Sequence, residues 1–264
     1  MNLEEITQET IKIAKKAGNF IKKEAAAFDR NVVEYKAVNN VVSYVDKETE
    51  KMIVRGLQKI VPEAQFITEE DTAQSADYQG LNWIIDPLDG TANFIHGLPN
   101  YSVSIALAKG TEVIVGVVYN INLKEMYSAW KGGGAFCNGK KISVSPISQL
   151  NESLLATGFP YYKFENQDKY LQILEALMQK THGLRRMGSA AIDLAFVASG
   201  KFDGFYEYNL NSWDMAAGVL LIKEAGGIVT DFSGGENYLF GGDIVAGSAV
   251  HTELLKEIQR FWSN

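Results

Sequence analysis

The most informative stretch of the chain is Trp83-Ile84-Ile85-Asp86-Pro87-Leu88-Asp89-Gly90-Thr91-Ala92-Asn93-Phe94. Its apolar first residues predict a buried strand, which delivers two carboxylates, Asp86 and Asp89, at its C-terminal end. Mg²⁺ in proteins is usually held by one or two carboxylates together with substrate phosphate. Backbone N–H groups at the start of a helix bind anions, and Gly90 and Thr91 follow the second carboxylate at once. The stretch therefore predicts a metal-binding face beside a phosphate-binding face.

An ordinary turn explains part of the same pattern. Asp-Gly after an apolar run is a common turn signal, and Pro87 favours a turn further. Taken alone, two aspartates around a proline are more often a solvated turn than a metal site. The other motifs of the chain decide between the two interpretations.

Composition limits the class of protein. The 264 residues can bury a large core, and hydrophobic and charged contents of 46% and 22% are typical of a globular protein. A formal charge of -7 without a basic cluster argues against a nucleic-acid partner. An acidic protein that takes an anionic substrate needs bound cations to invert the local field.

Two observations bear on location. Cys137 is the single cysteine, which excludes an internal disulfide and fits a reducing compartment, and we interpret it as structural. The first residues lack the basic and apolar regions of a secretory signal, and no run approaches the roughly 20 apolar residues that span a bilayer. We therefore expect a cytoplasmic protein with no membrane partner.

Hydrophobic periodicity predicts helices interleaved with antiparallel strands. The expected helices cover residues 3–21 (with Asn2 as N-cap), 46–60, 168–179, 189–198, 214–225 and a segment after 252. The expected strands cover 66–68, 83–85, 103–108, 113–119, 125–130, 136–144, 154–158, 202–208 and short segments near 228 and 244, with a hairpin turn at 109–112. This order predicts an α+β fold of stacked layers rather than a Rossmann sheet. We expect one structural unit, 1–264, whose halves, about 1–150 and 151–264, face each other across a cleft that holds the site.

Three further motifs carry polar groups at the ends of expected elements. Thr68-Glu69-Glu70-Asp71 places acidic residues after a strand, where a solvated loop is the plain alternative, and we expect that alternative to hold for Asp71. Trp213-Asp214-Met215-Ala216-Ala217-Gly218 opens a helix with an aspartate, whose commonest role there is an N-cap. Gly188-Ser189-Ala190-Ala191 and Asp46 also begin helices, either as caps or as parts of a site.

Together these motifs resemble the inositol monophosphatase family. The resemblance rests on Glu69-Glu70, on the stretch from Asp86 to Phe94 and on the Trp213–Gly218 motif, in this order and spacing, and it covers essentially the whole chain. It implies a layered αβαβα sandwich of the inositol monophosphatase and fructose-1,6-bisphosphatase type. It also implies a Mg²⁺-dependent phosphatase that is inhibited by Li⁺ and is usually a homodimer.

The resemblance also implies a role for individual residues. Glu69, Asp86 and the Leu88 carbonyl would hold a first Mg²⁺. Asp86, Asp89 and Asp214 would hold a second Mg²⁺. Glu69 with waters would hold a third, more weakly. Thr91, supported by Asp46, would orient the attacking water, and the Gly90 and Thr91 amides would bind phosphate. Ala190 and Glu207, with Asp89 and Asp214, would contact the sugar or polyol, and Lys36 would lie in a lid.

Formal charge agrees with this metal count. Glu69, Asp86, Asp89 and Asp214 carry four negative charges, and a phosphate monoester dianion adds two more. Three Mg²⁺ ions carry six positive charges, so the site is neutral when it is fully loaded. Without cations the carboxylates repel one another, and some of their pKa values should rise.

Several substrates fit the same chemistry. The first is a myo-inositol monophosphate. The alternatives are the 2′-phosphate of NADP, either alone or together with inositol phosphates, and fructose 1,6-bisphosphate. The short chain disfavours 3′-phosphoadenosine 5′-phosphate. No covalent nucleophile is required, because phosphoryl transfer depends mainly on positioning and electrostatics. A different class is a regulator without catalysis that binds sugar phosphates or a partner protein. Such a protein would be expected to lack at least one of the carboxylates.

Overall fold

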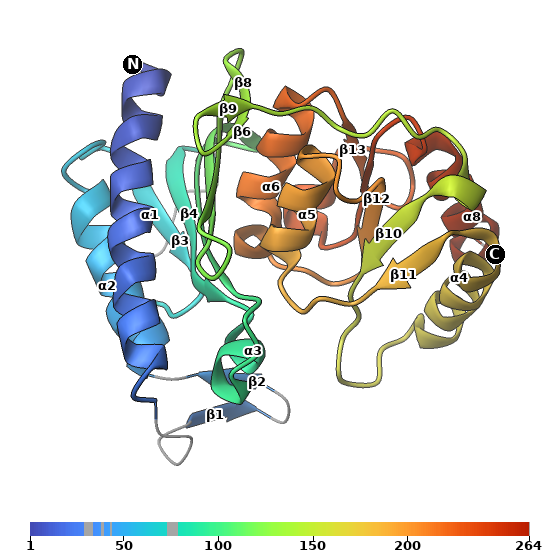
Figure 1. Cartoon of the computed structure of the whole chain (residues 1–264), viewed down its shortest axis with the longest axis horizontal. Helices are drawn as coiled ribbons and strands as arrows, with labels where there is room; N and C mark the ends of the chain where they lie inside the picture. Colours follow the sequence, from blue (N-terminus) through green and yellow to red (C-terminus); the bar gives the residue numbers. More distant parts are fainter. Residues whose placement is uncertain (29–33, 38–39, 43, 73–78, 264) are drawn as a thin grey trace.

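Five layers of secondary structure stack along the long axis of the molecule (Figure 1). The computed structural model describes the chain from residue 1 to 263, except residues 29–33, 38–39, 43 and 73–78. The five layers alternate helices and sheets, with one helical layer outside each sheet and one between them. The helices of the layers are α1 (Leu3–Ala25) and α2 (Tyr44–Leu57), then α5 (Ala190–Ala198) and α6 (Ser212–Glu224), then α4 (Gln167–Lys180) and α8 (His251–Trp262). The order confirms the α+β class and the layered αβαβα sandwich.

The first sheet has seven strands in sequential order. They are β3 (Gln65–Thr68), β4 (Leu81–Asp89), β5 (Ser102–Lys109), β6 (Glu112–Asn120), β7 (Glu125–Trp130), β8 (Gly134–Cys137) and β9 (Lys140–Lys141). β3 and β4 are parallel, and every later pair is antiparallel, as expected for the predicted antiparallel strands and hairpin.

The second sheet has five strands in the order β11-β10-β12-β14-β13. They are β10 (Leu154–Thr157), β11 (Gly183–Arg185), β12 (Gly204–Glu207), β13 (Ile228–Thr230) and β14 (Ile244–Gly247). β10 pairs in parallel with both of its neighbours, whereas β14 is antiparallel to β12 and β13. The smaller elements are β1 (Glu34–Ala37), β2 (Asn40–Val42), α3 (Thr91–His96), η2 (Leu150–Glu152) and α7 (Tyr238–Gly241).

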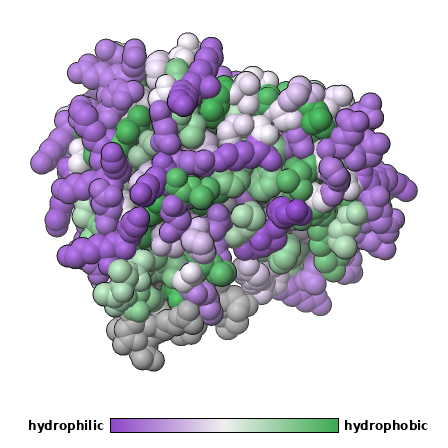
Figure 2. Space-filling model, in the orientation of Figure 1, coloured by the Kyte–Doolittle hydropathy of each residue, from purple (hydrophilic) through white to green (hydrophobic). Residues whose placement is uncertain are grey.

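Helix α1 forms where the sequence predicts it. The Asn2 side chain accepts a hydrogen bond from the Glu5 N–H at 3.2 Å, and acidic and basic residues occupy the first and last turns. One face packs on the first sheet through Ile6, Ala14 and Ile21. The opposite face is polar, and Figure 2 shows mostly hydrophilic residues at the left edge, where α1 and α2 lie.

Several predicted boundaries of helices and strands differ from those in the structure. Helix α2 begins at Tyr44 and ends at Leu57, so Asp46 lies in its first turn and does not begin it. Helix α6 begins at Ser212 after Asn211, so Asp214 is its third residue and not its N-cap. The strand predicted over 136–144 is two short strands, β8 and β9, and β11 was not predicted.

The middle helices are apolar on nearly every side because both of their faces are covered. All nine residues of α5 are buried, and α6 approaches β6 closely. A Cβ atom on Gly116 would lie 2.8 Å from the Ala217 carbonyl oxygen, and one on Gly218 would lie 2.4 Å from the Leu194 Cβ. Although α5 is so apolar, no helix among the described residues is long and apolar enough to cross a membrane.

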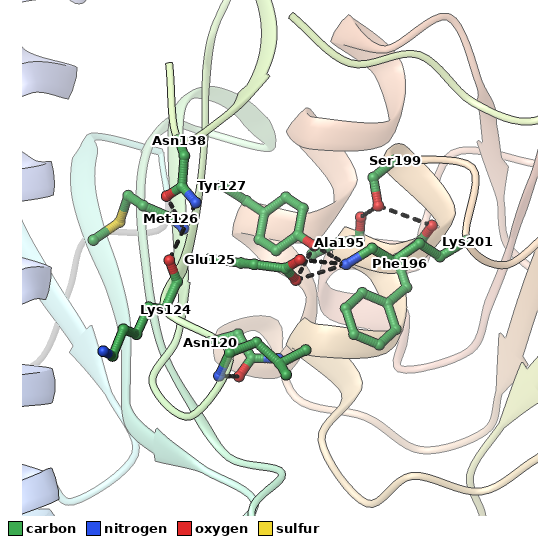
Figure 3. A network of polar contacts seen from close by, with 11 residues as sticks. Asn120, Lys124, Glu125, Met126, Tyr127, Asn138, Ala195, Phe196, Ser199 and Lys201 are labelled. Atoms are coloured by element: carbon green, nitrogen blue, oxygen red, sulfur yellow. Dashed lines mark hydrogen bonds and ion pairs between the residues drawn. The ribbon is translucent and has the colours of Figure 1, made fainter. Parts of the chain in front are cut away.

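A polar network fixes the end of α5 against the first sheet (Figure 3). The Lys201 ammonium donates to both carboxylate oxygens of Glu125 at 2.6 and 2.7 Å and to the Tyr127 hydroxyl at 3.0 Å. It also lies 4.4 Å from the centre of the Phe196 ring. The C-terminal end of α5 is thereby attached to β7, while its N-terminal end is free to contribute to a site.

We predict that Gly116→Ala lowers the free energy of unfolding by about 1–3 kcal/mol, because the new methyl group meets backbone that has no room to move. Gly56→Ala is the matched control, since the nearest atoms to its Cβ belong to the Ile13 side chain, with Cδ1 at 2.7 Å, and not to backbone. Alanine is also the better helix former, so this variant should be neutral or gain up to about 1 kcal/mol. Urea unfolding curves measure both values, and equal effects would contradict the close approach of α6 and β6.

Candidate metal and phosphate site

A bulge at the end of β4 brings Asp86 and Asp89 together. Asp86 pairs with Ser104 of β5 and Asp89 with Ser102, so three steps on β4 oppose two on β5. Side chains alternate along a regular strand, which would place residues three apart on opposite faces, and the extra residue cancels this alternation. Pro87 lies inside the bulge, where the missing N–H costs no ladder hydrogen bond.

Asp89 is held by the N-terminal end of α5. Its Oδ2 accepts hydrogen bonds from the Ser189 hydroxyl at 2.5 Å and from the Ala191 N–H at 2.8 Å. The segment before this helix is in turn held by Asn93, whose amide donates to the Met187 carbonyl at 2.9 Å. The structure thus uses Ser189 both as the N-cap of α5 and as a support for Asp89.

Asp214 reaches the same place from α6. Its Oδ2 accepts from the Asn211 N–H at 2.6 Å, which fixes the carboxylate at the start of the helix. Carboxylate oxygens of Asp86, Asp89 and Asp214 lie within 4.8 Å of one another. Two acidic residues from the end of β4 and one from the distant helix α6 therefore form one cluster.

Glu69 adjoins this cluster at the end of β3. Its N–H donates to the Ile85 carbonyl at 3.3 Å, which continues the parallel pairing of β3 with β4. Burial is the main cause of the raised pKa of Asp86, and the neighbouring Glu69 carboxyl group adds to it by repulsion and by a hydrogen bond. Asp71, two residues later, is exposed, as predicted for a solvated loop.

Thr91 links the cluster to α2. Its hydroxyl oxygen lies 2.9 Å from the Asp46 carboxylate and 2.9 Å from the Leu88 carbonyl oxygen, with one hydrogen to donate. Asp46 is buried, with 1% of its surface exposed. The predicted pair of Thr91 and Asp46 is therefore in contact, and the Leu88 carbonyl lies beside it.

Gly90 and Thr91 begin the short helix α3. Gly90 has φ 93°, a left-handed conformation that favours glycine, and its Cβ would lie 2.9 Å from the Asn100 carbonyl oxygen. The first N–H groups of a helix have no acceptor within the helix. The amides of Gly90 and Thr91 thus follow directly after Asp89 at a helix start.

A hollow of about 110 Å³ opens beside the acidic cluster. Asp89 and Asp214 line it together with the predicted residues Ala190 and Glu207. Gly158 allows Glu207 to lie there, because a Cβ at residue 158 would be 2.1 Å from the Glu207 Oε1. The four residues predicted for substrate contact therefore share one hollow.

Burial raises the pKa values of Asp86, Asp89, Asp214 and Glu207. The pKa of Asp89 rises to about 6, that of Asp214 to about 7 and that of Glu207 to about 8, and the pKa of Asp86 rises well above its usual range. Loss of water is the largest cause in every case, and repulsion from Asp89 adds to the rise for Asp214. The predicted rise in these pKa values is therefore present, but its main cause is burial and not repulsion between the carboxylates.

The donor set fits a hard divalent cation. All the converging side-chain donors are carboxylate oxygens, the ligands that Mg²⁺, Mn²⁺ and Ca²⁺ prefer, and soft ligands are absent from this set. The raised pKa values show that the protein alone does not supply enough positive charge and hydrogen bonds to stabilise the ionised carboxylates. A cation among Asp86, Asp89 and Asp214 supplies that compensation.

The sequence did not predict three residues near the site, and the side chain of one predicted residue is outside the described residues. Asp193 and Arg186 also line the hollow, and Arg186 stacks 4.8 Å from the centre of the Tyr161 ring and lowers the pKa of Glu207. An aspartate within the apolar run of α5 was the available signal. The third is Glu50, one helical turn after Asp46. The backbone of Lys36 lies in β1, but its side chain is outside the described residues, so the lid stays a prediction.

The remaining reactive residues lie elsewhere. His96 and His182 are exposed, and His251 is buried with its Nε2 3.0 Å from the Thr230 hydroxyl. Burial raises the pKa of the Cys137 thiol, which keeps it protonated. The partly buried Cys137 agrees with the structural role predicted for it.

We predict that Asp214→Asn stabilises the metal-free protein more at pH 8 than at pH 5. Because the folded-state pKa of Asp214, about 7, exceeds its ordinary value of 3.8, the folded protein retains a proton that the unfolded chain releases. The free energy of unfolding therefore falls as pH rises from about 4 to about 7. The substitution removes this fall, which is about 1 kcal/mol or more after solvent screening. Urea unfolding in EDTA measures it, with Asp71→Asn as the exposed control. A gain that does not vary with pH would contradict the buried charge.

Comparisons with known proteins identify the family of this chain. The model of the inositol monophosphatase family matches residues 2–263. The chain is 43% identical to the putative Nus factor SuhB of Neisseria meningitidis serogroup B (94% of this chain, 95% of that one) and 39% identical to the inositol-1-monophosphatase of Mesorhizobium japonicum (95% and 94%). The crystal structure of the extragenic suppressor protein suhB from Bartonella henselae superposes with a TM-score of 0.89 at 37% identity (96% and 98%). The chain therefore belongs to the inositol monophosphatase family.

Proposed function

We propose that the chain is a Mg²⁺-dependent phosphate monoester hydrolase with myo-inositol monophosphate as its substrate. The observation that carries the proposal is the convergence of Asp86, Asp89 and Asp214 beside a helix start and a polar hollow. Family membership supports phosphatase chemistry, and the relative from Mesorhizobium japonicum bears the name of this activity.

The cations are proposed to bind at the acidic cluster. Glu69, Asp86 and the Leu88 carbonyl would hold one Mg²⁺, and Asp86, Asp89 and Asp214 a second, with a weaker third at Glu69. When bound, Mg²⁺ neutralises the buried carboxylates and the phosphate and lowers the pKa of a coordinated water. Two or three ions balance most or all of the six negative charges of the carboxylates and the substrate.

The chain itself supplies positioning. When the Thr91 hydroxyl donates its hydrogen to Asp46, its lone pairs are left to accept from a water molecule and so to orient it. The Gly90 and Thr91 N–H groups bind phosphate oxygens at the start of α3. The buried walls around Asp89 exclude bulk water, which strengthens each of these interactions.

The hollow supports a hydroxyl-rich leaving group. Glu207 and Ala190, at the start of α5, line the hollow together with Asp89 and Asp214. Carboxylates accept hydrogen bonds from hydroxyl groups. This arrangement supports an inositol phosphate over NADP or fructose 1,6-bisphosphate, both of which remain candidates for the same chemistry.

Four finer properties belong to the same proposal. Li⁺ inhibits by competing for a Mg²⁺ position; the protein is a cytoplasmic homodimer; and residues 1–264 act as one catalytic unit with the site between its two halves. Exposed apolar side chains near α4 support self-association, since Tyr161, Tyr162 and Leu171 are 53%, 58% and 50% exposed.

A second candidate function is a role that needs no turnover. It is favoured by the relatives named Nus factor, which are 43% identical over about nine-tenths of the chain. The complete set of carboxylates favours catalysis, because selection for a partner surface alone does not require buried charges at such close range. The two functions are compatible within one protein.

The direct test measures phosphate release from myo-inositol 1-phosphate, NADP and fructose 1,6-bisphosphate, each with Mg²⁺ and with EDTA. We expect release with Mg²⁺ alone and the highest kcat/KM for the inositol phosphate. A higher value for NADP or fructose 1,6-bisphosphate would reassign the substrate. No release from any of them by folded protein would favour the role without turnover.

We predict that Asp89→Asn lowers kcat by at least about 10³-fold, since it removes a charge from the proposed metal site while Ser189 and Ala191 still have an oxygen to bond. Asp203→Asn is the matched control, because Asp203 is also buried and accepts a backbone N–H, that of Leu154 at 2.7 Å, away from the cluster. Its kcat should stay within about threefold of the unsubstituted protein. Near-normal turnover by Asp89→Asn would overturn the assignment.

A further inference from the structure

The turn after β3 is held by a buried glutamate of α2. Glu50 has no exposed surface, and its Oε2 accepts from the Glu70 N–H at 2.8 Å. Its Oε1 accepts from the Thr72 N–H at 2.8 Å and from the Thr72 hydroxyl at 2.6 Å. These three hydrogen bonds, the ones that the carboxylate makes among the described residues, go to one short segment directly after Glu69.

This segment needs an external support. Asp71 has φ 52°, a left-handed conformation that is strained for a residue with a side chain. Its two neighbours in the chain are the residues that Glu50 binds through their N–H groups. The carboxylate therefore spans the strained residue and fixes the direction in which the chain leaves β3.

The same helix supports a second part of the site. Asp46 and Glu50 are four residues apart, so they lie on one face of α2, one turn from each other. Asp46 contacts the Thr91 hydroxyl, and Glu50 contacts the turn that follows Glu69. One helix face therefore sets the positions of both Thr91 and the Glu69 turn.

The backbone on both sides of Glu69 is held by hydrogen bonds. Before it, β3 pairs with β4, and the Glu69 N–H itself reaches the Ile85 carbonyl. After it, the Glu70 N–H is fixed by Glu50. We propose that Glu50 is a positioning residue that holds Glu69 against Asp86 and thereby sets the affinity of the site for Mg²⁺. The inference rests on the proposed function, which places Mg²⁺ at Glu69 and Asp86.

The test is Glu50→Gln, with Mg²⁺ binding measured by isothermal titration calorimetry in the absence of substrate. The amide keeps one oxygen acceptor and turns an NH₂ group toward a backbone N–H, so at least one of the three hydrogen bonds is lost. Loss of a residue that orients a metal ligand typically weakens binding by about 10–100-fold, and we expect a Kd for Mg²⁺ raised about tenfold.

Glu224→Gln is the matched control. Glu224 of α6 likewise bonds two backbone N–H groups of another element, those of Gly132 and Gly134, each at 2.8 Å. It lies outside the site, so the substitution should leave the Kd for Mg²⁺ unchanged even if the melting temperature falls as much as in Glu50→Gln. Thr72→Val, which removes only one hydroxyl donor, is the milder variant should Glu50→Gln fail to fold, and it should raise the Kd about two- to fivefold.

The outcomes separate the inference from the function on which it rests. A raised Kd in Glu50→Gln or Thr72→Val with an unchanged Kd in Glu224→Gln supports the positioning role. Tight Mg²⁺ binding by the unsubstituted protein and equal binding by both Glu50→Gln and Thr72→Val would overturn the inference alone. Absence of Mg²⁺ binding by the unsubstituted protein would overturn the proposed function and the inference together.

Discussion

Buried negative charge at short range is the constraint on which the rest of the structure depends. Three carboxylates within 4.8 Å of one another are removed from water, and their raised pKa values show how unfavourable their ionised state is in the protein alone. The chain holds them in place with separate supports: a bulge for Asp86, the start of α5 for Asp89 and the backbone before α6 for Asp214. Each support is rigid because it belongs to a packed element.

The layered fold supplies these supports at one place. The bulged end of β4 comes from the first sheet, and α5 and α6 lie between the two sheets, so their N-terminal ends meet the end of β4 from the other side. The close approach of Gly116 to Ala217 and of Gly218 to Leu194 locks the helical layer to its neighbours. An apolar core on both sides of α6 offsets the cost of the charged cluster at its start.

Local sequence signals predicted much of the fold. Asn2 marks the start of α1, the Gly110-Thr111 turn marks the β5–β6 hairpin, and Ser189 marks the start of α5. The family resemblance named Asp86, Asp89 and Asp214, which the structure brings together; their roles stay predictions. What the sequence did not predict depends on distant partners. The bulge at Pro87 appears only in the pairing with β5, and Glu50 appears an ordinary helix residue until its bonds to Glu70 and Thr72 are seen.

The central claim is that the acidic cluster is a divalent-cation site. Anomalous diffraction from a crystal soaked in Mn²⁺, a substitute for Mg²⁺ with a measurable signal, tests it most directly. We expect at least one peak about 2.1 Å from carboxylate oxygens of Asp86, Asp89 and Asp214. A crystal with an intact cluster and no peak there, or with Mn²⁺ bound only elsewhere, would contradict it.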